Sequence, residues 1–234
     1  RLPGPGRGMR TMRTPTAIRL ALFVACALIV AGPGPATATI LDLTSAGANG
    51  TIGSGFFLQV CDLDIGTGPM DPFLRIHADY VEEGVNSDGP YTMDESAGTF
   101  THSLRVGDFG LVDLNGTPSI RFLLDINEPA GPPGASLLSL DMLKIYTAPV
   151  ATYNTVPDLE SMATKIYDLD AIEDSWIKLD YNLSEDPGGV AIYGDMYAYL
   201  PYSMFAGREG QYLYLYSHFG AEEGDWGSFD GQEA

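Results

Sequence analysis

The chain has 234 residues, of which 12 are Lys or Arg and 31 are Asp or Glu, so that its formal net charge is −19. Nucleic acids and anionic membrane surfaces are repelled by such a charge, because binding either of them requires a basic patch on the protein. The composition therefore excludes nucleic acid as a partner, whereas cations are attracted.

The first 38 residues have the pattern of a secretory signal peptide. Five arginines and no acidic residue precede Leu20, which begins a run of twelve apolar residues, and Ala36–Ala38 reads Ala-Thr-Ala. A basic segment, a short apolar run and an Ala-x-Ala site in this order are typical of exported proteins. The apolar run is shorter than the roughly 20 residues that a membrane-spanning helix needs. We therefore expect translation to start at Met9 or Met12, signal cleavage after Ala38, and a secreted protein whose mature domain does not insert into a membrane.

Removal of this signal leaves 196 residues with 7 basic and 31 acidic side chains, and a formal charge of −24. A chain of this length can form one domain with a real core. One cysteine remains, Cys61, so no disulfide can form within the mature chain, although the extracellular compartment would permit one. A lipoprotein signal at Cys26 is the weaker alternative, because Phe23 stands where such signals usually have Leu. We expect a single domain over residues 39–220, and a polar, Gly-rich tail over residues 221–234 that is either a surface loop or the start of a truncated segment.

Glycine and proline divide the mature chain into short segments rich in β-branched and aromatic residues, which is the pattern of strands. In chain order, the expected strands are Ile40–Thr44, Gly55–Val60, Phe73–Val81, Phe100–Val106, Leu111–Leu114, Ser119–Ile126, Leu137–Thr147, Thr164–Leu169, Ser175–Leu183, Asp195–Leu200 and Gln211–Ser217. Pro157–Ala163 is expected to form a short helix. Many short strands with turns between them predict an all-β protein, an antiparallel, jelly-roll-like β-sandwich.

Seven stretches of the mature chain carry a family resemblance. They are Gly68–Ile76, Glu83–Gly89, Phe122–Pro129, Leu137–Tyr146, Ser175–Tyr181, Gly194–Pro201 and Tyr212–Gly220. Together they resemble a group of uncharacterised exported bacterial proteins that usually end in a PEP-CTERM sorting tail, and they cover most of residues 40–220. The resemblance implies a cell-surface or matrix component of biofilm-forming bacteria, without a set of catalytic residues. No Pro-Glu-Pro motif or terminal apolar helix follows the domain here, so the expected localisation is secreted and extracellular, with surface attachment if a sorting tail lies outside this sequence.

Clusters of acidic residues indicate a divalent cation. Calcium takes six to eight oxygen ligands and tolerates irregular geometry. The preferred ligands are Asp168 and Asp170, with Asp180 or Asp195 arriving from neighbouring strands. None of the acidic clusters has the spacing of an EF-hand loop, and the alternative is that these side chains cap turns of the local backbone. Structural calcium is the one cofactor that the sequence suggests.

The strand Gln211–Ser217 alternates tyrosine with leucine. Because the side-chain period of a strand is two, Tyr212, Tyr214 and Tyr216 must share one face. A row of aromatic rings could form a platform on which sugar rings stack, which would make the domain a carbohydrate-binding module with extracellular polysaccharide as its partner. The alternative is that the same stripe is one wall of the core.

Catalytic residues are harder to find. Nucleophilic catalysis needs Ser or Cys beside His and an acid. His77 and His102 stand apart in predicted strands and His218 directly follows another, and the mature chain has no Gly-x-Ser-x-Gly motif. A carboxylate pair for glycoside hydrolysis cannot be singled out among 31 acids. The sequence therefore favours a secreted, non-enzymatic protein of the extracellular matrix or cell surface with a structural or adhesive role. A carbohydrate-binding module and a jelly-roll hydrolase are the alternatives.

Overall fold

The computed structural model describes residues 39–60, 72–78, 81–96, 99–126, 136–183 and 194–221, all of which belong to the unit Ala36–Ala234. Within these residues twelve strands form two sheets, accompanied by one α-helix and three 3₁₀ helices. The predicted signal peptide, Cys61 and the tail after Ala221 lie outside the described residues. No helix in the described part of the chain is both long enough and apolar enough to cross a membrane.

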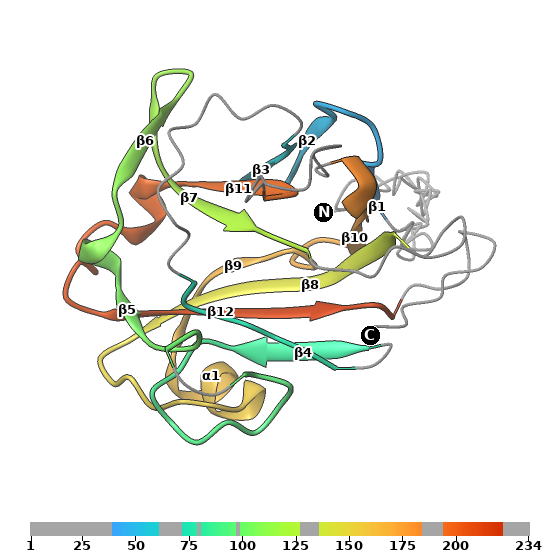
Figure 1. Cartoon of the computed structure of the whole chain (residues 1–234). Coiled ribbons are helices and arrows are strands. Elements are labelled where there is room, and N and C mark those ends of the chain that lie inside the picture. The colour runs from blue at the N-terminus through green and yellow to red at the C-terminus, as the bar shows by residue number, and fades with distance from the viewer. Residues whose placement is uncertain are drawn as a thin grey trace, which may run out of the picture. The chain divides into compact units, whose positions relative to one another are not determined.

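The strands form one sheet of seven and one sheet of five, which lie one above the other (Figure 1). The seven-stranded sheet has the order β1 (Thr39–Asp42), β10 (Ser175–Asp180), β8 (Leu137–Ala148), β12 (Tyr212–Phe219) and β4 (Glu82–Val85), with β9 (Thr164–Asp168) also paired to β8 and β5 (Leu104–Arg105) to β12. The five-stranded sheet has the order β2 (Asn49–Ile52), β3 (Gly55–Gln59), β11 (Met196–Pro201), β7 (Thr117–Leu124) and β6 (Leu111–Leu114). Among these pairs only β1–β10 is parallel. The predicted all-β fold, an antiparallel β-sandwich, is confirmed.

The last two strands complete both sheets. β11 lies between β3 and β7 in the five-stranded sheet, and β12 lies between β8 and β4 in the seven-stranded sheet. Both sheets therefore take an inner strand from residues 196–219, far along the chain from most of the strands that they pair with. Such pairings are slow to form, because the entropy of closing long loops is lost before the contacts are gained.

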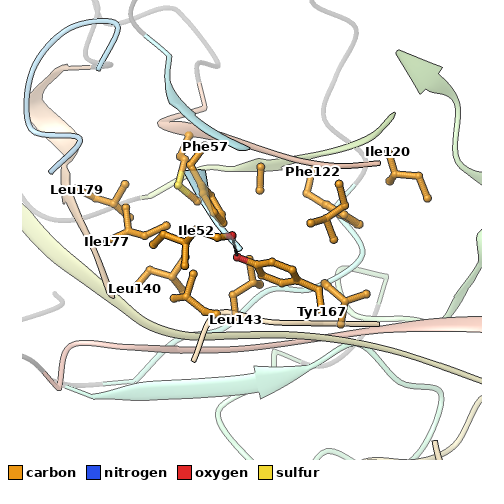
Figure 2. Packing of buried hydrophobic residues seen from close by; sticks show 14 of the residues in the cluster. Ile52, Phe57, Ile120, Phe122, Leu140, Leu143, Tyr167, Ile177 and Leu179 are labelled. Carbon is orange, nitrogen blue, oxygen red and sulfur yellow. Dashed lines mark hydrogen bonds between the residues drawn. The ribbon is translucent and has the colours of Figure 1, made fainter. Parts of the chain in front are cut away.

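The main hydrophobic core fills the space between the two sheets (Figure 2). Phe57 of β3 and Ile120 of β7 point into it from the five-stranded sheet, and Ile177 of β10 does so from the other sheet. Tyr167 of β9 spans this space, and its O–H donates to the carbonyl of Ile52 in β2 at 2.9 Å. Burial raises the pKa of Tyr167, so this neutral hydroxyl ties one sheet to the backbone of the other.

A second hydrophobic cluster covers the outer face of the seven-stranded sheet. It includes Leu159 of α1 (Val156–Met162), and Figure 1 shows this helix beside β4 and β12, on the side away from the five-stranded sheet. The helix begins at Thr155, whose hydroxyl accepts from the amide of Asp158 at 3.2 Å, an N-cap of the usual kind. Leu159 packs in this cluster with Tyr146 of β8. Both faces of the seven-stranded sheet therefore carry a packed layer.

Most of the predicted elements are confirmed within a few residues: β1, β3, β6 to β12, and α1. Two predicted strands are wrong. Residues 72–78 hold only a single bridge, between Ile76 and Glu95, and Phe100–Val106 keeps just the two residues of β5 before a 3₁₀ turn. In the first case two backbone hydrogen bonds, from His77 and Ser96, join the paired segments, which is too few for a ladder.

The sequence pattern does not reveal β2 and β4, because Gly, Asn and Glu have low β propensity. β2 forms since the turn that follows it, with Gly53 at φ 57°, folds it back onto β3. β4 forms at a sheet edge, where the buried carboxylate of Glu95 accepts from the amide of Val85 at 3.1 Å. β2 therefore depends on a local hairpin turn and β4 on a tertiary contact, and in both strands these outweigh the low strand propensity of the residues.

Candidate functional site

The tyrosine stripe of β12 lies on the outer face of the seven-stranded sheet. As predicted, Tyr212, Tyr214 and Tyr216 share this face, while Leu213 belongs to the core between the sheets. Tyr214 is 0% exposed and Tyr216 is 4% exposed, and only Tyr212 is partly open to solvent. The ring of Tyr153 stacks on that of Tyr214 with 6.0 Å between the centroids. The stripe is therefore covered over most of its length.

The hydroxyl groups of the two buried tyrosines have partners inside the domain. Tyr214 donates to the carbonyl of Val150 and accepts from the amide of Tyr153. Tyr216 donates to the carboxylate of Glu83. Burial raises the pKa of Tyr214 to about 12, and burial together with the Glu83 carboxylate raises the pKa of Tyr216. Both side chains are neutral hydrogen-bond donors at ordinary pH.

Charged groups fasten α1 to the same face. Tyr146 of β8, opposite Tyr214 in the ladder, donates to Glu160 Oε1 of α1 at 2.7 Å. Glu160 also lies 2.8 Å from Lys165 Nζ and 3.5 Å from Lys144 Nζ. The hydrogen bond from Lys165 is the main cause that lowers the pKa of Glu160. This network closes the helix over the tyrosines.

The burial removes the platform on which the sugar-binding prediction depends. A sugar ring can stack only on an exposed aromatic face, and Tyr214 and Tyr216 offer none. The alternative prediction, that the stripe is a wall of the core, describes these two residues. Tyr212 alone reaches the surface, where the guanidinium of Arg105 lies 4.7 Å from its ring centroid and donates to its hydroxyl at 3.0 Å.

The predicted calcium ligands do not come together as one set. Asp168 is the last residue of β9 and lies opposite Lys144 of β8 in the strand ladder. Asp180 is the last residue of β10 and lies opposite Leu137, at the far end of β8. At about 3.3 Å per strand residue, these two positions are roughly 20 Å apart. Asp195 stands at the start of β11 in the other sheet. No single ion can bind Asp168 and Asp180 together.

Asp195 is committed to the backbone of the five-stranded sheet. It is 2% exposed, its amide donates to the carbonyl of Leu124 at 2.7 Å, and its Oδ2 accepts from the amide of Ile126 at 2.6 Å. The side chain thus extends the pairing of β11 with β7 by one more bond. Since an unpaired buried amide costs about 1–3 kcal/mol, this carboxylate is a structural group.

Asp168 and Asp170 do come together, in the turn between β9 and β10. Asp168 accepts from the amide of Asp170 at 3.1 Å and from Lys165 Nζ at 2.9 Å, and Asp170 accepts from the amide of Ser175 at 2.9 Å. Burial raises the pKa of Asp170, and the charge of Asp168 adds to this effect. These contacts are those of turn-capping carboxylates. Over the described ranges, no three His, Cys, Asp or Glu side chains are grouped to hold a metal ion.

A histidine–carboxylate pair that the sequence does not single out lies near the end of β12. A bulge between His218 and Phe219 leaves Asp141 of β8 without a cross-strand partner. Asp141 is 8% exposed, and its Oδ2 accepts from the amide of Ala221 at 2.8 Å and lies 3.4 Å from His218 Nδ1. Within the described part of the chain, Asp141 Oδ1 and His218 Nδ1 are buried without a hydrogen-bond partner. The one feature of the sequence that points to this pair is Asp141 itself, an acidic residue within the otherwise largely apolar strand β8.

This pair should make stability depend on pH. The carboxylate of Asp141 raises the pKa of His218 above its usual 6.5, with Glu83 and Asp94 adding to the effect and burial opposing it. A raised folded-state pKa stabilises the fold fully below the unfolded pKa, and this stabilisation is lost as the pH rises through the folded pKa. We therefore expect Asp141→Asn to lower Tm by several degrees more at about pH 5.5 than at about pH 8.5.

Thermal melting at the two pH values measures this difference. Asp113→Asn is the matched control, because Asp113 caps an exposed turn through the amide of Gly116 and faces no histidine in the described contacts. Its effect on Tm should be the same at both pH values. An equal loss for Asp141→Asn at both would contradict the coupling to His218.

A third cluster, also not evident from the sequence, lies on the outer face of the five-stranded sheet. Tyr197 and Tyr199 of β11 have ring centroids 5.8 Å apart, and Phe56 of β3 lies 5.9 Å from Tyr199. The guanidinium of Arg121 stands 4.4 Å from the ring centroid of Tyr197. Both tyrosines are buried. The alternation of tyrosine with Met196 and Ala198 was its sequence signal.

The three histidines considered for catalysis lie in different segments. His218 is in β12, which extends two residues past the predicted strand Gln211–Ser217, whereas His77 and His102 lie outside the strands. Their backbone amides donate to the carbonyls of Asp94 and Phe73, respectively.

The fold places the protein in the class of all-β sandwich proteins. The chain matches no protein-family model, and the comparisons with curated proteins and with solved structures find no match either. The resemblance to exported proteins with PEP-CTERM tails stays a prediction from sequence.

Proposed function

We propose that the protein is an exported, non-enzymatic β-sandwich protein that serves as a structural component of the extracellular matrix or the cell surface. The observation that carries the proposal is the position of the predicted cleavage site relative to the described strands. Residues 1–38 have the order of a signal peptide, and every described strand, from β1 (Thr39–Asp42) onward, follows the predicted cleavage site. Cleavage there would remove the whole signal and leave every described strand in the mature chain.

The use of polar side chains supports a structural role. The hydroxyls of Tyr214 and Tyr216, the carboxylate of Asp195 and the amide of Asn86 all hydrogen-bond within the fold. The mature charge of −24 favours a highly soluble protein. The resemblance to exported bacterial proteins supports a place at the cell surface or in the matrix.

Export is tested by fractionating a Gram-negative host that expresses the chain with a C-terminal tag. We expect the protein outside the cytoplasm, and we expect Leu22→Arg with Val24→Arg to hold it inside, because two charges interrupt the apolar run. Leu22→Ile with Val24→Ile is the matched control and should be exported. A wild-type chain that stays in the cytoplasm would contradict the proposal, as would export of the arginine variant.

Calcium binding is proposed only for the turn that holds Asp168 and Asp170. The ion would compete there with Lys165, which already pairs with Asp168. Binding to the native state alone stabilises by RT ln(1 + [L]/Kd), about 2.7 kcal/mol at a hundredfold excess over Kd. Millimolar calcium should therefore raise Tm by several degrees relative to chelator, and more than magnesium does.

Asp170→Asn should abolish this rise in Tm. Asp180→Asn should leave it unchanged, because Asp180 lies roughly 20 Å from Asp168, as counted along the register of β8. Equal melting with calcium, magnesium and chelator would reject the site. An equal rise with both ions would leave only general screening of charge.

Neither alternative function gains support from the residues on which it was based. A carbohydrate-binding module would need a platform other than the β12 stripe, since Tyr214 is buried. For the hydrolase, a screen of polysaccharide and ester substrates is the test. We expect no turnover; turnover that one carboxylate or histidine substitution abolishes would make the protein an enzyme.

A further inference from the structure

The first strand of the mature chain is held at the edge of the seven-stranded sheet. β1 pairs in parallel with β10, from Thr39 opposite Ser175 to Asp42 opposite Lys178, and Figure 1 shows β1 beside β10. Cleavage after Ala38 would convert the nitrogen of Thr39, the first described residue of β1, from a peptide amide into an α-ammonium group. The groups around the Thr39 nitrogen are therefore the ones that the new positive charge would face.

The turn before β10 holds this residue. The amide of Thr39 donates to the carbonyl of Asp174 at 2.9 Å, and its hydroxyl donates to the carboxylate of Glu173. Thr39 and Glu173 are both partly buried. The nitrogen is thus already seated against the turn by two contacts from its own residue, one of them to a carboxylate.

This turn carries more negative than positive charge. Four carboxylates lie between β9 and β10 or at their ends: Asp168, Asp170, Glu173 and Asp174. The basic groups around them are Lys165, which pairs with Asp168, Lys144 of β8, which acts on Asp170, and Lys178 of β10, whose ammonium lies 5.3 Å from the ring centroid of Trp176. β2, which packs on β1, contains no charged residue.

We propose that the α-ammonium group created at Thr39 by signal cleavage is bound by this acidic turn and fastens β1 to the edge of the sheet. The inference rests on the proposed export and extends it, because it makes processing a step that completes the fold. Before cleavage the Thr39 nitrogen is a neutral amide. After cleavage it keeps its donor role toward Asp174 and adds a positive charge next to Glu173. The repulsion among the turn carboxylates falls as a result.

The experiment compares purified chains that all continue from Thr39. One has a free amine, one is Nα-acetylated, and one carries a Gly-Ser-Ala extension. Each is made in the wild-type, Glu173→Gln and Asp125→Asn backgrounds, with calcium chelated. Asp125 is the matched control because it is an exposed acid of the other sheet, after β7. The readouts are Tm across pH and the pKa of the α-amine, followed by its reactivity toward an amine reagent.

In the wild-type background we expect the free amine to melt a few degrees above the other two forms near neutral pH, and this gap to close once the amine is deprotonated. The α-amine pKa should exceed its ordinary value of about 7.7–8.0. Glu173→Gln should reduce both effects and Asp125→Asn neither. Equal melting of the three forms, or a gap that Glu173→Gln leaves unchanged, would overturn the proposal. The purified chains do not depend on export, so a failure of export would be seen separately in the fractionation.

Discussion

Replacing Asn86 by alanine is expected to lower the free energy of unfolding by roughly 3 kcal/mol. Three backbone groups would lose a partner, at about 1 kcal/mol each, the lower end of the usual cost of an unsatisfied buried group. Asn86 is fully buried between β4 and β5, which pair with different parts of β12. Its Nδ2 donates to the carbonyls of Leu213 at 3.0 Å and His102 at 3.3 Å, and its Oδ1 accepts from the amide of Leu215 at 2.6 Å. The side chain of Asn86 thus supplies the hydrogen bonds to β12 that a strand residue between β4 and β5 would otherwise make.

Thermal and denaturant unfolding measure this loss, which corresponds to a fall in Tm of roughly 6–12 °C for a domain of this size. Asn86→Asp should also destabilise, because it keeps the acceptor for Leu215 but places an oxygen against the two carbonyls. The matched control is Asn49→Ala, at an exposed residue with one bond to the carbonyl of Gly47, where the change should stay within about 0.5 kcal/mol. Similar melting of Asn86→Ala and Asn49→Ala would show that the ladder does not depend on Asn86.

Replacing Tyr214 by alanine is expected to have the largest effect of a single side chain on the outer face, about 3–5 kcal/mol, because a buried aromatic residue leaves a cavity when it is truncated. Tyr214 packs against Tyr146, Leu159 and the ring of Tyr153. Tyr214→Phe removes only the hydroxyl that Val150 and Tyr153 share, and should cost about 1 kcal/mol.

The comparison that separates core from platform is Tyr214→Ala against Tyr212→Ala. Tyr212 lies at the partly exposed end of the stripe, so its replacement should cost much less. If the stripe were an open binding surface, both replacements would be tolerated and both would weaken binding to a polysaccharide. A Tyr214→Ala protein with wild-type Tm would contradict the assignment of this residue to the core.

The period of a strand predicts which residues share a face, but not what covers that face. The alternation of Tyr212, Leu213 and Tyr214 predicted the two faces of β12 correctly. That the tyrosine face is closed depends on α1, whose Leu159 joins the same cluster from a separate part of the chain. No local pattern contains this information. The same limit explains β4, which the tertiary contact from Val85 to Glu95 supports against weak propensity.

The predicted calcium ligands also show that a sequence pattern places neighbouring residues but not residues from separate strands. Asp168 and Asp170 are two residues apart, and their proximity in one turn could be predicted. The positions of Asp180 and Asp195 could not, because they depend on strand register along β8 and on which sheet β11 joins. Asp141 was overlooked because only the bulge opposite His218 gives it a role.

The central claim is that this is an exported sandwich whose mature chain begins with β1. The most direct measurement is the intact mass and N-terminal sequence of the exported protein. The account predicts a single N-terminus at Thr39, with no residue of the signal retained and all of β1 present. A mature chain that still contains Arg19, or one that begins after Asp42 and so lacks β1, would contradict it.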